Sequence, residues 1–336
     1  MALPSWILEQ RRALLMQRGH AWLLHGPSGL GQFSLAMELA RAWLCDAAHA
    51  DGACGACTSC HAIDVHAHAD LAVLMPETYM LERGWPLSEK AQSEIDDKKR
   101  KPSREIRVDA MRATVEFSQR TSARGRAKVV VVYPAEQMNA IASNALLKTL
   151  EEPPGDTRFV LATEAAHALL PTIRSRCMAH ALRWPAENQV LDWLQLEGVP
   201  AAAAAPLLRA AGGRPDDALQ LARSGAEPLA WAQFPKAMQR GDARAVEGWT
   251  PAAAIAALQK LCHDLQRKAV GASPRYFQSA DLPNAPQHQQ LAHWGKDLAQ
   301  AARSADHPFH VPLMLEALVA QARNVLHSST ATAKKI

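Results

Sequence analysis

The stretch Gly26-Pro-Ser-Gly29-Leu-Gly31-Gln32-Phe33 decides the fold of this chain. An apolar run at residues 21–25 precedes it, and a run with helical spacing follows it at residues 34–43. A strand, a glycine loop and a helix in this order are typical of a phosphate-binding P-loop, and the glycines fit the register of G-x-x-x-x-G-K-[ST]. The alternative is an ordinary turn between a strand and a helix, unrelated to nucleotides.

Two residues of the loop do not suit a nucleotide. Gln32 stands where a lysine should reach the β- and γ-phosphates, and Phe33 replaces the hydroxyl that should bind Mg²⁺. A neutral amide supplies no charge to a triphosphate, and a phenyl ring cannot ligate a metal. The loop therefore predicts the fold of an ATPase without ATP binding or hydrolysis.

The run Lys-Val-Val-Val-Val-Tyr at residues 128–133 also lacks a metal ligand at its end. Its short, β-branched and uninterrupted composition predicts a buried parallel strand. In a P-loop protein such a strand ends in a carboxylate that holds Mg²⁺. Here Pro134 stands at that place, and Glu136, two residues further on, is a poor substitute. The loss of lysine, hydroxyl and carboxylate together favours a non-hydrolysing protein.

Four of the six cysteines lie in one short segment, with the spacing C-x8-C-x2-C-x2-C at Cys45, Cys54, Cys57 and Cys60. In a reducing cytoplasm such a cluster favours a metal over disulfides. Four thiolates suit tetrahedral Zn²⁺, and a closed four-sulfur site leaves no open position for chemistry, so we expect a structural zinc. The alternatives are an iron–sulfur cluster, a three-cysteine site completed by His61, and cysteines without a metal.

Length and composition indicate a multidomain globular protein. A chain of 336 residues suggests two or three domains, and no stretch approaches 18 consecutive apolar residues. The first residues lack the basic start and long apolar core of a signal peptide, so we expect a cytoplasmic protein that does not contact a membrane. A net charge of +4 is compatible with nucleic acid nearby but does not indicate that this chain binds it.

Further strands and helices alternate along the first half, which predicts an α/β fold with a parallel sheet covered by helices. Residues 76–103 carry mixed charges with little periodicity, so we expect a long exposed or disordered loop there. Interleaved acidic residues make a DNA contact by its basic cluster the less favoured alternative. The expected strands are residues 70–75, 128–133 and 158–163, and the expected helices are residues 106–122 and 140–150.

Three segments together resemble a known family. Residues 144–154 (Asn-Ala-Leu-Leu-Lys-Thr-Leu-Glu-Glu-Pro-Pro), 159–163 (Phe-Val-Leu-Ala-Thr) and 170–177 (Leu-Pro-Thr-Ile-Arg-Ser-Arg-Cys) closely resemble the clamp-loader subunits of the AAA+ class. With the four-cysteine segment and the degenerate P-loop, the chain is similar to the clamp-loader subunits of bacterial DNA polymerase III that do not hydrolyse ATP. The resemblance is specific from about residue 21 to residue 183, and beyond about residue 225 it is one of composition alone.

The resemblance implies three domains. Residues 1–165 would form a degenerate P-loop AAA+ domain, with the zinc module inserted at residues 45–60. Residues 166–224 would form a helical lid, and residues 225–336 an all-α collar that joins the subunits of a pentameric ring.

Two details of the last two domains follow from the residues there, and a third, on Arg214, follows from the resemblance. Residues 312–323 predict a helix with a broad apolar face, suited to a core or a partner. Residues 264–294 contain several prolines and polar residues and predict an irregular connection. Arg214 stands near the place where ATPase relatives sense nucleotide, and we expect it to have a capping or surface role instead.

The chemistry that the resemblance implies lies in Ser175-Arg176-Cys177. In ring ATPases an arginine of one subunit reaches the γ-phosphate held by its neighbour, and such arginines raise the rate by about 10³–10⁵. By resemblance Arg176 is this arginine, acting in trans. The alternative is a structural arginine that caps the short helix after Pro171. Cys177 is expected to be a small buried hydrophobe without a nucleophilic role.

The implied function is that of a clamp-loader subunit with no catalytic activity of its own, within the DNA-directed DNA polymerase holoenzyme. Its partners would be the other subunits of the ring and, through the complex, the sliding clamp and primed DNA. One alternative is an ATP-hydrolysing AAA+ motor or switch, which Gln32, Phe33 and Pro134 disfavour. The other is a zinc-dependent DNA-binding regulator, which is disfavoured because the cysteine segment lacks a basic recognition helix.

Overall fold

The protein forms two compact units, Met1–Trp193 and Leu194–Ile336. A computed structural model describes residues 3–225, 227–305, 307 and 310–327. None of the described helices combines the length and the apolar composition needed to cross a membrane. Each unit is described below by itself.

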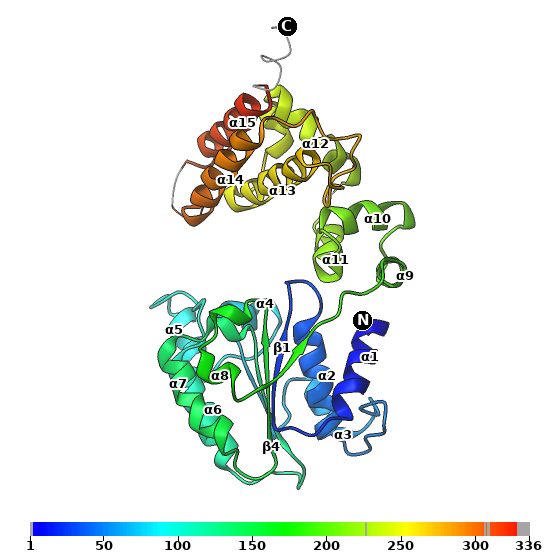
Figure 1. Ribbon diagram of the computed structural model, residues 1–336. Helices are drawn as coiled ribbons and strands as arrows, with labels where there is room; N and C mark the ends of the chain where they lie inside the picture. Colours follow the sequence, from blue (N-terminus) through cyan, green and yellow to red (C-terminus); the bar gives the residue numbers. More distant parts are fainter. Residues whose placement is uncertain (1–2, 226, 306, 308–309, 328–336) are drawn as a thin grey trace, which may run out of the picture. The chain divides into compact units, whose positions relative to one another are not determined.

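A five-stranded parallel sheet with the strand order β2-β3-β4-β1-β5 is the centre of the first unit (Figure 1). β1 pairs with β4 on one side and with β5 on the other, so that Trp22 lies opposite both Val160 and Met178. β3 is buried along its whole length, as its run of valines predicts. The strands are β1 (Ala21–His25), β2 (Leu71–Leu74), β3 (Lys128–Val132), β4 (Thr157–Thr163) and β5 (Met178–Ala181). The predicted α/β fold with a parallel sheet is confirmed.

Helices cover both faces of the sheet (Figure 1). One face carries α1 (Ser5–Leu15), α2 (Gln32–Leu44) and α3 (Thr58–Asp64), and the other carries α6 (Val108–Gln119), α7 (Ala140–Glu151) and the short α8 (Pro171–Arg174). Burial of apolar side chains between these layers is the main driving force for this arrangement. The core between the sheet and the second group of helices includes Met111, Val130, Val132, Leu146, Leu150, Phe159, Leu161 and Ile173.

The sheet extends past residue 165, where we expected the P-loop domain to end. Its edge strand β5 lies at Met178–Ala181, beyond that boundary. The first compact unit accordingly includes every strand of the sheet and continues to Trp193. The further division of the chain into a lid and a collar stays a prediction.

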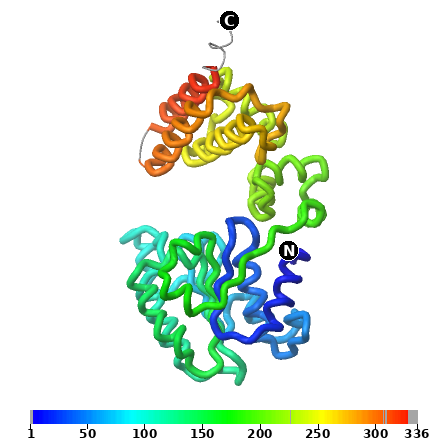
Figure 2. The backbone as a smooth tube through the Cα atoms, viewed as in Figure 1, coloured from blue at the N-terminus to red at the C-terminus, as the bar shows by residue number. Residues whose placement is uncertain are grey.

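Residues 76–103 are exposed along most of their length, as the sequence predicts, but they do not form one long loop. They form α4 (Glu77–Glu82) and α5 (Glu89–Asp96), the cyan stretch of the backbone in Figure 2. The buried Glu77 carboxylate accepts hydrogen bonds from Arg100 Nη2 (2.7 Å) and from the backbone N–H of Ser103 (2.8 Å). Arg100 also pairs with Glu94 at 2.7 Å. The prediction of a loop was wrong because two short helices and the ion pairs of Arg100 give the segment a defined fold, while most of its charged side chains still face solvent.

Helices are the only regular elements among the described residues of the second unit. They are α10 (Ala201–Ala210), α11 (Pro215–Arg223), α12 (Pro228–Arg240), the short 3₁₀ helix η3 (Ala243–Val246), α13 (Pro251–Ala269), α14 (His288–Arg303) and α15 (Val311–His327). α9 (Glu187–Leu196) crosses the boundary between the units. Their core gathers Phe234, Leu261, Phe277, Leu291, Trp294 and Leu318. The predicted helix at residues 312–323 is confirmed by α15, whose buried face includes Leu315, Val319 and Ala322.

The irregular connection is shorter than the predicted residues 264–294. α13 continues to Ala269 and α14 begins at His288, so the irregular part covers residues 270–287. The three prolines of the predicted segment, Pro274, Pro283 and Pro286, all lie in this shorter part. The predicted bounds were wrong because the polar residues at both ends belong to α13 and α14 rather than to a loop.

Three cationic side chains meet at the turn that joins α10 to α11. Lys260 Nζ donates to the carbonyl of residue 210 (2.9 Å), and Arg214 Nε donates to that of residue 211 (3.0 Å). Arg275 donates through Nε (3.0 Å) and Nη2 (2.7 Å) to the carbonyl of Gly212. Cations at a helix C-terminus satisfy its free carbonyls and suit its dipole. Arg214 thus has a capping contact, and α10 is tied to residues of α13 and of the following loop.

Asp264 organises the loop that carries Arg275. Its carboxylate is fully buried and accepts hydrogen bonds from the backbone N–H groups of Arg275 (2.9 Å), Tyr276 (2.7 Å) and Phe277 (2.9 Å). Three backbone donors aimed at one carboxylate offset the cost of removing its charge from water. The position of Arg275 at the α10–α11 turn therefore depends on Asp264.

We expect Asp264→Asn to lower the free energy of unfolding of the protein by about 1–3 kcal/mol. Asparagine offers one acceptor oxygen instead of two and turns an N–H group toward backbone donors. Urea or thermal unfolding followed by circular dichroism measures the change. Asp192→Asn, at an exposed position of α9, is the matched control and should unfold like the wild type. Equal stability of the two variants would contradict the role of Asp264.

Candidate functional site

The glycine loop occupies the position of a P-loop, between the end of β1 and the start of α2. Gly29 and Gly31 have positive φ angles of 75° and 92°, a region that favours glycine. A Cβ atom on Gly31 would also lie 2.8 Å from Cδ1 of Ile7. The backbone of this turn therefore requires glycine at residues 29 and 31, as the sequence pattern predicts.

Gln32 closes the loop on itself. Its side chain is buried, with 2% of the residue exposed, and Nε2 donates to the carbonyls of Gly26 (2.9 Å) and Pro27 (2.7 Å). Both N–H groups of the amide are used by these two bonds. The place from which a lysine would reach a phosphate is therefore filled by an internal hydrogen-bonded contact.

Phe33 lies in a group of aromatic rings around an arginine. Its ring centroid is 5.3 Å from that of Tyr133, and the Arg83 guanidinium carbon lies 5.0 Å from the Phe33 centroid and 5.6 Å from the Tyr133 centroid. Such distances allow cation–π attraction. Tyr133 also donates to Glu164 Oε1 at 3.0 Å, and burial raises the pKa of its phenol. Phe33 thus packs with the Tyr133 ring and the Arg83 cation, and its side chain provides no hydroxyl that could bind a metal.

Glu136 is not directed toward the loop as a substitute metal ligand. One carboxylate oxygen accepts from Thr163 Oγ1 (2.6 Å), and the other accepts from the backbone N–H of Glu164 (3.0 Å). Both oxygens are thus engaged at the end of β4. Pro134 follows Tyr133 directly after β3, where a carboxylate would be needed.

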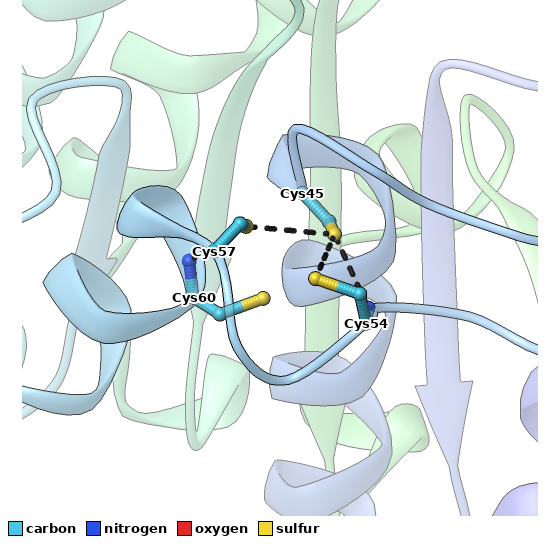
Figure 3. A group of neighbouring side chains, drawn as sticks. All are labelled: Cys45, Cys54, Cys57 and Cys60. Carbon is cyan, nitrogen blue, oxygen red and sulfur yellow. Dashed lines mark hydrogen bonds between the residues drawn. The ribbon is translucent and has the colours of Figure 1, made fainter.

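Four cysteine sulfurs converge beside the end of α2 (Figure 3). All four ligand atoms of Cys45, Cys54, Cys57 and Cys60 lie within 4.8 Å of one another, and Cys45 Sγ lies 3.5 Å from Cys54 Sγ and 3.8 Å from Cys57 Sγ. Tetrahedral Zn²⁺ with bonds of about 2.3 Å places its sulfurs about 3.8 Å apart. The cluster fits a closed four-sulfur metal site. Within the described part of the chain, the nitrogens of His61 do not belong to this group of ligand atoms.

The metal-free thiols differ in acidity. Burial opposes the ionisation of Cys57, but the backbone N–H groups of Cys60 and Asp46 donate to its sulfur and lower its pKa to about 6. Burial and the neighbouring Cys57 sulfur raise the pKa of Cys60 to about 12. A metal has to displace these protons, so its affinity for the cluster is expected to fall as the pH falls.

Polar contacts connect the cysteine segment with the loop before β3. The Asp46 carboxylate accepts from Ser59 Oγ (2.7 Å) and from the Ser59 backbone (3.1 Å), and these bonds lower its pKa to about 2. Arg124 Nη1 donates to Thr58 Oγ1 (2.9 Å) and Ser59 Oγ (3.0 Å), while Arg126 Nη2 donates to the Asp46 carbonyl (2.7 Å). The segment is therefore held against the body of the first unit by charged side chains.

Arg176 lies at the other edge of the sheet from the P-loop. It follows α8 and precedes β5, and because β5 is parallel to β1, it stands at the amino-terminal edge while the P-loop follows the carboxyl end of β1. Its Nε donates to Glu151 Oε1 at 2.6 Å, its Nη2 contacts the same oxygen, and its Nη1 donates to the Thr172 carbonyl at 2.7 Å. Its side chain stays 30% exposed. Arg176 therefore caps α8, as the structural alternative predicts, and remains accessible.

Cys177 is half-buried and packs against the core of the sheet. Burial raises the pKa of its thiol to about 12, so it is neutral at physiological pH. The neutral state agrees with the predicted role as a small hydrophobe.

Sequence reasoning did not single out Arg83 or Glu151. Arg83 belongs to the segment predicted as a loop, and its approach to Phe33 and Tyr133 depends on the fold of residues 76–103. Glu151 is part of the segment 144–154 that carries the family resemblance, but nothing in its spacing from Arg176 indicates a contact.

The model of the family described as DNA polymerase III, delta subunit, matches residues 10–185. DNA polymerase III subunit delta′ of Pseudomonas aeruginosa is 40% identical over 207 residues, which are 61% of this chain and 56% of the relative. Subunit delta′ of Escherichia coli is 35% identical over 203 residues, 60% of this chain and 54% of the relative. The matched part of the chain thus spans about half the length of these curated relatives.

The chain also aligns with solved structures, one of which serves as an example. It is that of a DNA polymerase III gamma subunit-related protein from Thermotoga maritima, with 17% sequence identity and a TM-score of 0.48, covering 95% of this chain and 99% of that one.

We expect the purified protein to contain about one zinc ion per chain, because four thiolates in this geometry form a closed tetrahedral site. Metal analysis after purification without chelators measures it. Cys57→Ser should lower the zinc content and loosen residues 45–60, seen as faster proteolysis there. Cys177→Ser is the control and should keep the metal. Iron with visible absorbance, or no metal in the wild type, would contradict the assignment.

Proposed function

The chain belongs to the DNA polymerase III delta-subunit family, and we propose that it is a clamp-loader subunit that does not hydrolyse ATP. In this proposal it acts in the cytoplasm within the bacterial replicative DNA polymerase III holoenzyme. It is one member of a pentameric AAA+ ring that loads the sliding clamp onto primed DNA. It has no catalytic activity of its own and contributes structure and one arginine to the ring.

The contact of Gln32 with the loop carbonyls carries this proposal. An ATP-binding P-loop needs a lysine that faces the phosphates and a hydroxyl on Mg²⁺. Here the Gln32 amide is used within the loop, and Phe33 packs with Tyr133 and Arg83. A triphosphate would have to break the buried amide contacts without gaining a lysine or a metal ligand. The same observation disfavours an ATP-hydrolysing motor or switch.

The proposed role of Arg176 is to act in trans on ATP held by an adjacent subunit. Its position at the amino-terminal edge of the sheet keeps it away from the P-loop of its own chain, so a phosphate it contacts belongs to another subunit. A planar guanidinium suits bidentate contact with phosphate oxygens. The Arg176 side chain is accessible enough for such a contact. Its bonds to Glu151 and Thr172 define the position of the guanidinium before it meets the phosphate.

The remaining parts of the proposal concern architecture. The cysteine cluster would hold a structural Zn²⁺ that supplies rigidity, since four sulfurs leave no open position for a substrate. Residues 166–224 would serve as a lid and residues 225–336 as the collar that joins the ring. Exposed apolar side chains on α15, Val311 (42% exposed) and Leu313 (64% exposed), support a partner surface in the collar.

We expect the purified chain neither to bind nor to hydrolyse Mg·ATP at micromolar concentrations, because its loop offers neither charge nor metal ligand. Isothermal titration calorimetry and a phosphate-release assay measure this, with an ATP-hydrolysing clamp-loader subunit as the positive control. Gln32→Lys alone should not create an ATPase, since Phe33 and Pro134 still exclude the metal. Micromolar affinity of the wild-type chain would refute this part of the proposal.

Arg176→Ala should lower DNA- and clamp-stimulated ATP hydrolysis by the reconstituted ring, although this subunit binds no ATP. The loss should be partial, because other ATP sites receive arginines from other subunits. Arg176→Lys should rescue poorly, since an ammonium cannot match the planar fork of a guanidinium. Folding should be nearly unchanged, because exposed ion pairs contribute only about 0–1 kcal/mol.

Turnover per purified ring, normalised for subunit content, is the deciding measurement for Arg176. Arg174→Ala, two residues earlier and exposed, is the matched control. A purely capping role would give a lower melting temperature and poor assembly, with unchanged turnover per assembled ring. Full turnover in Arg176→Ala rings would exclude the role in trans.

A further inference from the structure

We propose that Glu151 is a positioning residue for Arg176, and that its carboxylate holds the guanidinium in the orientation from which it reaches a phosphate of the adjacent subunit. The inference rests on the proposed function of Arg176 in trans. It concerns a residue that touches neither the phosphate nor the metal and acts through the arginine alone.

Contacts on two sides hold the guanidinium of Arg176. Nε donates to Glu151 Oε1 at 2.6 Å, and Nη2 contacts the same oxygen. Nη1 donates to the carbonyl of Thr172 at 2.7 Å. A long side chain that makes only one such contact can still rotate about it, whereas contacts to a carboxylate and to a backbone carbonyl define the plane of the group. Glu151 and Thr172 therefore determine the direction in which Arg176 points.

These contacts leave the end of the guanidinium available. Arginine has five N–H groups, one on Nε and two on each Nη. The three short bonds use one N–H from each nitrogen, which leaves one on Nη2. The second N–H of Nη1 makes only a long contact with Ser175 Oγ (3.5 Å), which a phosphate oxygen can replace. A pair of N–H groups from two nitrogens of one guanidinium is what bidentate contact with phosphate uses. The geometry thus restrains the arginine while it keeps a pair of donors for a ligand.

Both restraining groups stand on well-anchored elements. Glu151 is the last residue of α7, and the preceding Leu150 is 1% exposed in the core of the sheet. Thr172 belongs to α8, whose Ile173 is fully buried in the same core. Packing in the core fixes the ends of both helices, and these ends in turn fix the position of the guanidinium. Glu151 itself is 47% exposed, so it adds little to stability, and orientation of Arg176 remains as its role.

The inference is tested in rings reconstituted with the ATP-hydrolysing subunits, by comparing Glu151→Ala, Glu151→Gln, Arg176→Ala and the double variant. The quantity of interest is the Arg176-dependent turnover, the difference between wild-type and Arg176→Ala rings. Glu151→Ala should reduce this quantity about two- to fivefold, the range that an exposed ion pair allows. The KM for ATP should not change, because an arginine in trans acts in the transition state. Glu151→Gln keeps an acceptor oxygen and should recover part of the loss.

Two controls separate positioning from a structural effect. Glu152→Gln changes the neighbouring exposed carboxylate and should leave turnover at the wild-type level. All variants should keep the melting temperature and ring assembly of the wild type. The double variant Glu151→Ala with Arg176→Ala should be no slower than Arg176→Ala alone, since Glu151 acts only through the arginine.

Each contrary result has a distinct meaning. Full turnover in Arg176→Ala rings would contradict the proposed function of Arg176 in trans, on which this inference rests. Impaired Arg176→Ala rings together with fully active Glu151→Ala rings would overturn the positioning role alone. Turnover above the wild type in Glu151→Ala rings would show that Glu151 restrains the arginine from acting, which also overturns it. A further loss in the double variant would mean that Glu151 acts by another route.

Discussion

Parallel pairing of β1 with both β4 and β5 is the constraint on which the placement of the candidate sites depends. His25, the last residue of β1, lies opposite Thr163 and Ala181, so the segments after these strands share one edge. That edge holds the glycine loop, the aromatic rings around Arg83 and the carboxylates that follow β3 and β4. Entry into β5 takes place at the other edge, which is where Arg176 stands. The glycine loop, which the Gln32 side chain fills, and the accessible Arg176 thus lie at opposite edges of the same sheet, one strand length apart.

Local patterns were sufficient to predict the strand–loop–helix unit and the cysteine cluster from the sequence. The glycines have to follow β1 directly, and the four cysteines lie within residues 45–60, so spacing alone implies proximity. Contacts made at long range were not predictable in this way. Arg100 meets Glu77, 23 residues earlier in the chain, and Arg176 meets Glu151, 25 residues earlier, without a periodic signal. The fold of residues 76–103, and with it the place of Arg83, depends on such pairs.

Carboxylates that accept several hydrogen bonds explain much of the irregular structure. Asp70, fully buried, accepts from Ser122 Oγ (3.0 Å) and from the backbone N–H groups of Ala123 (2.8 Å) and Arg124 (3.0 Å). Burial opposes its ionisation, but these bonds lower its pKa. The same contacts explain why α6 ends at Gln119 and not at residue 122 as predicted. The Asp46 carboxylate accepts hydrogen bonds that order the cysteine segment, and the Asp264 carboxylate accepts hydrogen bonds that order the loop of Arg275. Ordering of loops by carboxylates, whether buried like Asp70 and Asp264 or exposed like Asp46, gives little periodic signal in a sequence.

The amide of Gln32 also has a consequence for the history of this loop. A cation in place of Gln32 would have to take over the bonds to the carbonyls of Gly26 and Pro27, and it would put a charge where 2% of the residue is exposed. A chain that drifts toward nucleotide binding one substitution at a time would lose stability first, since Phe33 and Pro134 still prevent any compensation from a ligand. Selection for a stable fold would therefore disfavour such a step. We infer that the packing of the loop itself would hold Gln32 in place, independently of what the loop binds.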